Sequence, residues 1–63
     1  MKREIYFEIK SRATTPEGIS RAIWKNVDGL QEDEFTPEAV KKMLITGEIV
    51  ADGNKITTYA DVC

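Results

Sequence analysis

The stretch TPEAVKKMLITGEIVADGNKITTY, residues Thr36–Tyr59, decides the fold of this chain. Thr36 is a favoured helix N-cap, and Pro37 suits the first turn of a helix. Apolar residues then recur at helical spacing as far as Gly47, a residue type that commonly ends helices. The first half of the stretch therefore predicts a capped helix with a glycine stop.

A β-hairpin is predicted in the second half. The segments Ile49–Ala51 and Ile56–Tyr59 flank Asp52-Gly53, and this dipeptide favours a tight type I′ turn because both turn residues need a positive φ. A turn centred on Gly53-Asn54 is the alternative, and both turns leave the same side chains on one face. That inner face carries Ile49, Ala51, Ile56 and Thr58, while Val50, Lys55, Thr57 and Tyr59 face away.

Upstream of this unit the sequence predicts a strand and another helix. In Glu4–Lys10 apolar and polar residues alternate, which is typical of a half-buried strand, with Tyr6 on its polar side. Thr15 begins a helix with an apolar stripe, and Gly29 is the expected stop. Phe35, just before the second cap, is placed to pack on Val40.

These elements give a single α+β domain, 1–63, with the order β-α-α-β-β. We expect two layers, a three-stranded, mainly antiparallel sheet with two helices packed on one face. An up-down helix pair favours pairing of the first strand with the second. The predicted core consists of Ile5, Phe7, Ile19, Ile23, Val27, Val40, Leu44, Ile49 and Ile56.

Length and charge limit the possible functions. A chain of 63 residues buries only about 60% of its unfolded surface, so a homodimer or a permanent partner would supplement its stability. The net charge is −2, but residues 1–25 sum to +3 and residues 26–63 to −5. The molecule is therefore expected to be electrically polar. Its apolar runs are only about three residues long, so we expect no membrane span and a cytoplasmic location.

Enzymatic chemistry finds little support in the residues. The chain has no histidine, and its single cysteine, Cys63, is the last residue. The acidic run Glu32–Glu34 lacks the alternating ligands and mid-loop glycine of a calcium loop. Asp52–Asn54 lacks the repeated glycines that cradle a phosphate. We therefore expect no catalytic residues, no metal and no cofactor.

Two helices followed by a hairpin also resemble a winged-helix or excisionase-type DNA-binding module. In that alternative the helix after Thr36 would read the major groove and Asp52–Lys55 would form the wing tip. The charges disagree, because that helix offers only Lys41 and Lys42 as cations and the acidic run would repel phosphate. We therefore expect nucleic acid not to be the main partner.

Two kinds of side chain could contact a protein partner. Acids at Glu32, Asp33 and Glu34 would dock on a basic surface, or they only keep a loop solvated. Tyr6 and Tyr59 are expected together on the outer sheet face, where they would bind a partner or only stabilise the sheet. Trp24 is either a filler at the edge of the core or a binding hot spot.

The leading functional hypothesis is a small intracellular interaction module that binds and modulates or inhibits another protein. In size and style the chain is similar to accessory proteins that phages and mobile elements direct at host proteins, which is an analogy only. The alternatives are the winged-helix-like nucleic-acid regulator and a structural subunit that oligomerises through its outer sheet face.

Overall fold

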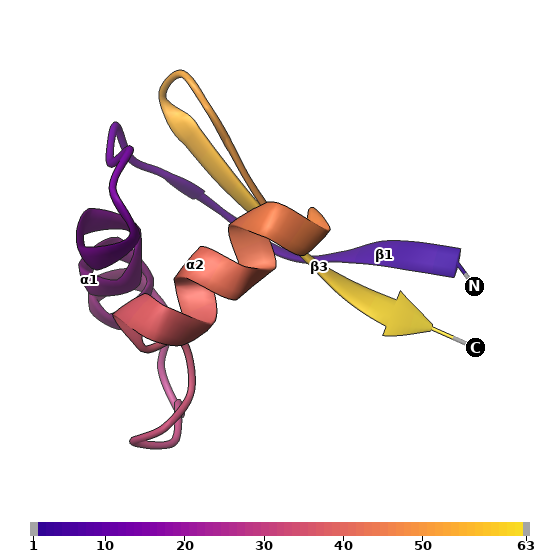
Figure 1. The fold of residues 1–63 in the computed structure, drawn as a ribbon, viewed down its shortest axis with the longest axis horizontal. Coiled ribbons are helices and arrows are strands. Elements are labelled where there is room, and N and C mark those ends of the chain that lie inside the picture. The colour runs from indigo at the N-terminus through magenta and orange to yellow at the C-terminus, as the bar shows by residue number, and fades with distance from the viewer. Residues whose placement is uncertain (1, 63) are drawn as a thin grey trace.

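The computed structural model describes residues 2–62, and the side chains of residues 3–60. It contains one three-stranded antiparallel sheet and two helices that pack on one face of it (Figure 1). The small α+β domain expected from the sequence is confirmed. Its elements are β1 (Lys2–Lys10), α1 (Pro16–Asn26), α2 (Pro37–Thr46), β2 (Ile49–Asp52) and β3 (Lys55–Val62).

Both helices begin where their capping residues predict. The Thr15 hydroxyl accepts the N–H of Gly18 at 3.1 Å, and the Thr36 hydroxyl accepts the N–H of Ala39 at 3.2 Å. Each bond satisfies a donor that the first turn of a helix leaves without a partner. Gly47 ends α2 in the left-handed region at φ +85°, as predicted.

The end of α1 differs from the prediction. The helix ends at Asn26, and Gly29 lies in the following connection at φ +81°. Val27 takes an extended conformation while its N–H still donates to the carbonyl of Ile23 at 2.8 Å. Val27 is half-buried against the core, so turning the chain at this β-branched residue serves packing better than another helical turn would.

The strand order is β1-β3-β2, so the predicted pairing of β1 with β2 is wrong. Strand β3 lies in the centre and pairs antiparallel with both neighbours. Strand β1 has nine residues, β2 has four and β3 has eight. Strand β1 therefore forms a much longer ladder with β3 than it could form with β2. Ladder length, which hairpin rules do not specify, favours the observed order.

The hairpin turn also differs from the first expectation. Asp52 pairs with Lys55, which leaves Gly53 and Asn54 as the two turn residues. Gly53 has φ +62°, whereas Asn54 is not among the residues with positive φ. A glycine with positive φ at the first central position is the pattern of a type II′ turn rather than type I′.

A β-bulge interrupts β1. Ile5 pairs with Tyr59 and Phe7 pairs with the preceding residue of β3, Thr58, so Tyr6 is the extra residue. The alternation of faces changes phase there, and Ile5 moves to the face opposite Phe7. Ile5 is 59% exposed, so its predicted place in the core is wrong.

The rest of the predicted core is largely confirmed. Phe7, Val27 and Leu44 are half-buried against it, whereas Ala51 is exposed because β2 is an edge strand. Phe35 and Val40 are both buried in it, as the predicted packing of this pair requires. The buried apolar residues of the core are Ile9, Ile19, Ile23, Phe35, Val40, Ile49 and Ile56.

Candidate functional site

The connection between the helices holds the predicted acidic residues in a fixed turn. The N–H of Glu34 donates to the carbonyl of Gln31 at 3.0 Å. The indole N–H of Trp24 donates to the carbonyl of Glu34 at 3.1 Å, and the buried Ser20 hydroxyl donates to the carbonyl of Phe35. Two side chains of α1 thus hold the backbone of residues 31–35, called here the acidic turn.

Phe35 closes the acidic turn in an uncommon conformation. Its φ of +53° lies in the left-handed region, which bulky residues rarely adopt. Its ring is buried and meets the ring of Phe7 edge-on, with centroids 5.6 Å apart. The gain from burying this ring offsets the backbone strain, and the chain reverses sharply between exposed acids and buried core.

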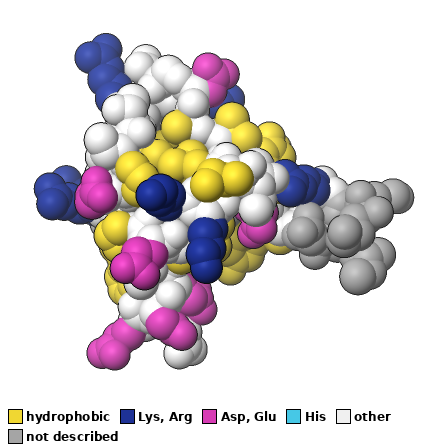
Figure 2. Space-filling view, viewed as in Figure 1, with side chains coloured by type: hydrophobic (Ala, Val, Ile, Leu, Met, Phe, Trp, Pro, Cys, Tyr) yellow, Lys and Arg dark blue, Asp and Glu magenta, His cyan; other side chains and the backbone are white. Residues whose placement is uncertain are grey.

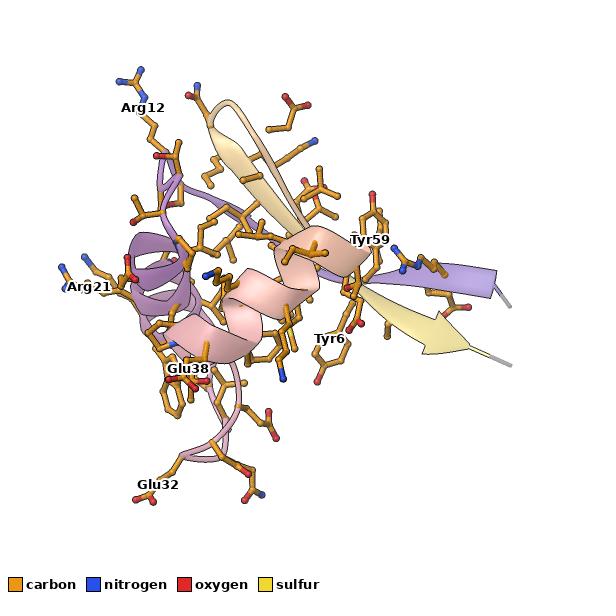
Figure 3. All side chains as sticks on the ribbon, viewed as in Figure 1. Tyr6, Arg12, Arg21, Glu32, Glu38 and Tyr59 are labelled. Atoms are coloured by element: carbon orange, nitrogen blue, oxygen red, sulfur yellow. The ribbon has the colours of Figure 1, made fainter. Side chains whose placement is uncertain are left out.

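The acids of this turn are exposed, and Trp24 lies beside them. Glu32, Asp33 and Glu34 all lie at the surface, and Trp24 is 40% exposed. We call these four residues the acidic–Trp24 surface. Figure 2 shows Asp and Glu side chains gathered at the end of the molecule that carries the turn. Arg12 lies at the opposite end from Glu32 (Figure 3).

The two tyrosines predicted to share the outer sheet face do not meet. The Tyr6 ring lies 5.2 Å from that of Phe7, which belongs to the helix-covered face, and Tyr6 is 63% exposed. Tyr59 is half-buried and pairs with Ile5. The two side chains point away from each other (Figure 3). The bulge is the cause, because it removes Tyr6 from the alternation that would place it beside Tyr59.

The geometry of a DNA-reading helix pair is not reproduced. Residues 27–36 separate α1 from α2, whereas a helix-turn-helix motif uses a turn of about three or four residues. The exposed side of α2 presents Glu38, Lys41, Lys42 and Ile45, which include neither arginine nor an amide side chain for base edges. The acidic turn lies between the two helices along the chain, where phosphate would be repelled.

No site for small-molecule chemistry emerges from the described residues. Across residues 2–62 the structure contains no pocket and no cluster of three or more His, Cys, Asp or Glu side chains that could hold a metal ion. Within the same residues, neither helix has the length and apolar character to cross a membrane. Cys63 lies outside the described residues.

Sequence reasoning missed one of the two α1 residues that hold the acidic turn, Ser20. Ser20 lies on the buried side of α1 beside Ile19, and a serine among buried apolar residues signals that its hydroxyl needs a partner. Its actual partner, the carbonyl of Phe35, lies fifteen positions away, so no local pattern identifies it.

Comparison with known proteins found no relative: no protein-family model, no curated protein and no solved structure matches this chain.

Proposed function

We propose that this chain is a small protein-interaction module that binds its partner through the acidic–Trp24 surface. The observation that carries the proposal is the hydrogen bond from the Trp24 indole to the carbonyl of Glu34. It joins an exposed aromatic ring to the backbone that carries the run of carboxylates. Of the three aromatic residues considered from the sequence, Trp24 is the one placed beside the acids.

A partner with a basic surface fits this arrangement. Carboxylates at the rim speed diffusional encounter and make it depend on salt, while a buried tryptophan supplies much of the affinity. Because the turn is already held by α1, little conformational entropy is lost when it binds. We propose an intracellular protein as the target, modulated or inhibited by occupation of its basic site.

A matched pair of double variants tests the proposal. Glu32→Lys with Asp33→Lys reverses two charges on the acidic turn and leaves Glu34, whose backbone carries two of the turn's hydrogen bonds. Glu4→Lys with Glu17→Lys reverses two exposed charges elsewhere. Each pair raises the net charge from −2 by four, to +2, so both variants differ from the parent by the same total charge.

The assay is affinity capture from nuclease-treated lysate, followed by surface plasmon resonance with the captured protein across a salt series. We expect the control pair to bind like the parent and the turn pair to associate at least about tenfold more slowly at low salt. Trp24→Ala should mainly speed dissociation. Equal association by both double variants, or association that does not depend on salt, would remove the acidic turn from the binding site.

The nucleic-acid alternative has its own measurement. A gel-shift assay at physiological salt should show only background affinity, with dissociation constants of about 10⁻⁴–10⁻⁶ M. Sequence-selective binding below that range would replace the protein-binding proposal with a nucleic-acid regulator.

A further inference from the structure

The bulge at Tyr6 moves an apolar side chain to the sheet face that the helices leave uncovered. Regular alternation from Phe7 would return Ile5 to the helix-covered face. Instead, Ile5 pairs with Tyr59 and is 59% exposed. Bulges often serve to re-aim side chains near functional surfaces. An isoleucine that a bulge exposes is therefore a stronger indication of a binding surface than an isolated surface isoleucine is.

The register gathers further residues around Ile5. Val50 pairs with Thr57, and Thr57 lies two positions before Tyr59 on the central strand, so all four share one face. Thr57 is only 7% exposed although no helix covers it, because this short side chain stands on the central strand between its longer cross-strand partners Glu8 and Val50. Val50 is 42% exposed at the edge. We call Ile5, Val50, Thr57 and Tyr59 the outer patch.

The charged residues beside the outer patch balance one another. Lys55 pairs with Lys10 across β1 and with Asp52 across β2, and its ammonium group lies 3.7 Å from the carboxylate of Glu8. With Arg3 and Asp61, which pair two positions beyond Ile5 and Tyr59, this rim holds three basic and three acidic residues. A neutral rim gives no attraction for a phosphate backbone, whereas two copies related by a two-fold axis could set acids opposite lysines.

We propose that the outer patch binds a second copy of this chain, giving a symmetric dimer in which the two sheets pack face to face. Each protomer would bury about 800 Å² in a standard interface. That is roughly one sixth of its 4740 Å² accessible surface. Pairing along the β1 edge is less suitable, because a bulge and charged side chains protect edges from other strands.

This dimer is independent of the proposed function. Ile5 and Val50 lie on the sheet, and the acidic turn lies in the helix connection, so a variant in one leaves the other intact. A dimer would present two acidic–Trp24 surfaces, which raises avidity for a partner with repeated basic sites.

Sedimentation equilibrium over a concentration series tests the proposal. The parent should pass from 7.1 kDa toward twice that mass as its concentration rises to about 1 mM. Ile5→Lys and Val50→Lys should each raise the dimer dissociation constant about tenfold or more. The matched control is Ile45→Lys, which changes another isoleucine, 79% exposed on α2, and should leave dimerisation unchanged.

Circular dichroism first checks that each variant is folded, and Val50→Lys serves if Ile5→Lys is not. A parent that stays at 7.1 kDa throughout would overturn the proposal. Equal weakening by Ile45→Lys would also overturn it, since the contact would then involve α2. Binding of single-stranded RNA by a monomer through Tyr59 would assign the face to a different occupant.

Discussion

Replacing Thr58 by valine should stabilise this fold. Thr58 is 3% exposed on the central strand, between Phe7 and Ile49 in the register, and its hydroxyl has no hydrogen-bond partner among the described residues. A buried hydroxyl without a partner costs about 1–3 kcal/mol of stability. Valine has nearly the same shape, remains β-branched and carries no polar atom to desolvate.

The expected gain in free energy of unfolding is about 1–2 kcal/mol, somewhat below the full penalty because a small shift can bring in solvent. In a domain of this size each kcal/mol raises Tm by about 4–8 °C. Thermal melts followed by circular dichroism, together with urea titrations, measure both quantities. An unchanged dependence on urea would show that the variant and the parent expose similar surface on unfolding.

Thr58→Ser provides the matched control. It keeps the hydroxyl and removes the methyl group, so it should lose about 1 kcal/mol through the cavity it leaves. If Thr58→Val is no more stable than the parent, the hydroxyl has a partner, such as a buried water, and the reasoning fails.

Three further changes test the fold. Ile23→Ala, at a fully buried position, should lower the free energy of unfolding by about 2–5 kcal/mol. Leu44 is half-buried, so the loss for Leu44→Ala should lie near or below the lower end of that range. A Leu44→Ala variant that melts at the same temperature as the parent would show that this face of α2 is not packed. Gly53→Val should lower Tm through backbone strain alone, because nothing lies within 4 Å of an added Cβ while φ is +62°, and an unchanged melt would exclude the tight turn. Arg3→Met should lower the free energy of unfolding by about 1 kcal/mol in urea titrations, because the guanidinium donates to the Thr46 carbonyl at 2.9 Å, at the negative end of α2. Arg3→Lys keeps the positive charge and should retain part of this stability. Equal losses in the two variants would show that the positive charge of Arg3 contributes nothing to stability.

The helices were predictable because their signals are local. A threonine cap followed by proline marks both starts, and Gly47 marks the end of α2, each within one turn of the residue it affects. The predicted end of α1 was wrong because Gly29 satisfies the same rule, that a glycine often ends a helix. Packing of Val27 against the core, a contact between distant segments, ended the helix earlier.

The sheet was less predictable because its pairing is long-range. An alternating segment specifies two faces but neither its partner nor an inserted residue. Tyr6 has no feature that marks it as the bulge, since it is a good β-former in a regular pattern. The bulge becomes visible only when β1 is set beside β3, and it places both Ile5 and Tyr6 outside their expected surroundings.

The acidic–Trp24 surface shows how far function and fold can be separated in a chain this small. The sequence predicted that the binding side chains would not contribute to folding, and for the carboxylates of Glu32 and Asp33 this stays a prediction. Trp24 is different, because its ring is exposed while its N–H holds the turn. Removing the whole side chain is therefore expected to alter both the proposed contact surface and the shape of the turn. Trp24→Phe would keep an aromatic ring and remove only the donor, so comparing it with Trp24→Ala distinguishes a contact residue from a positioning residue.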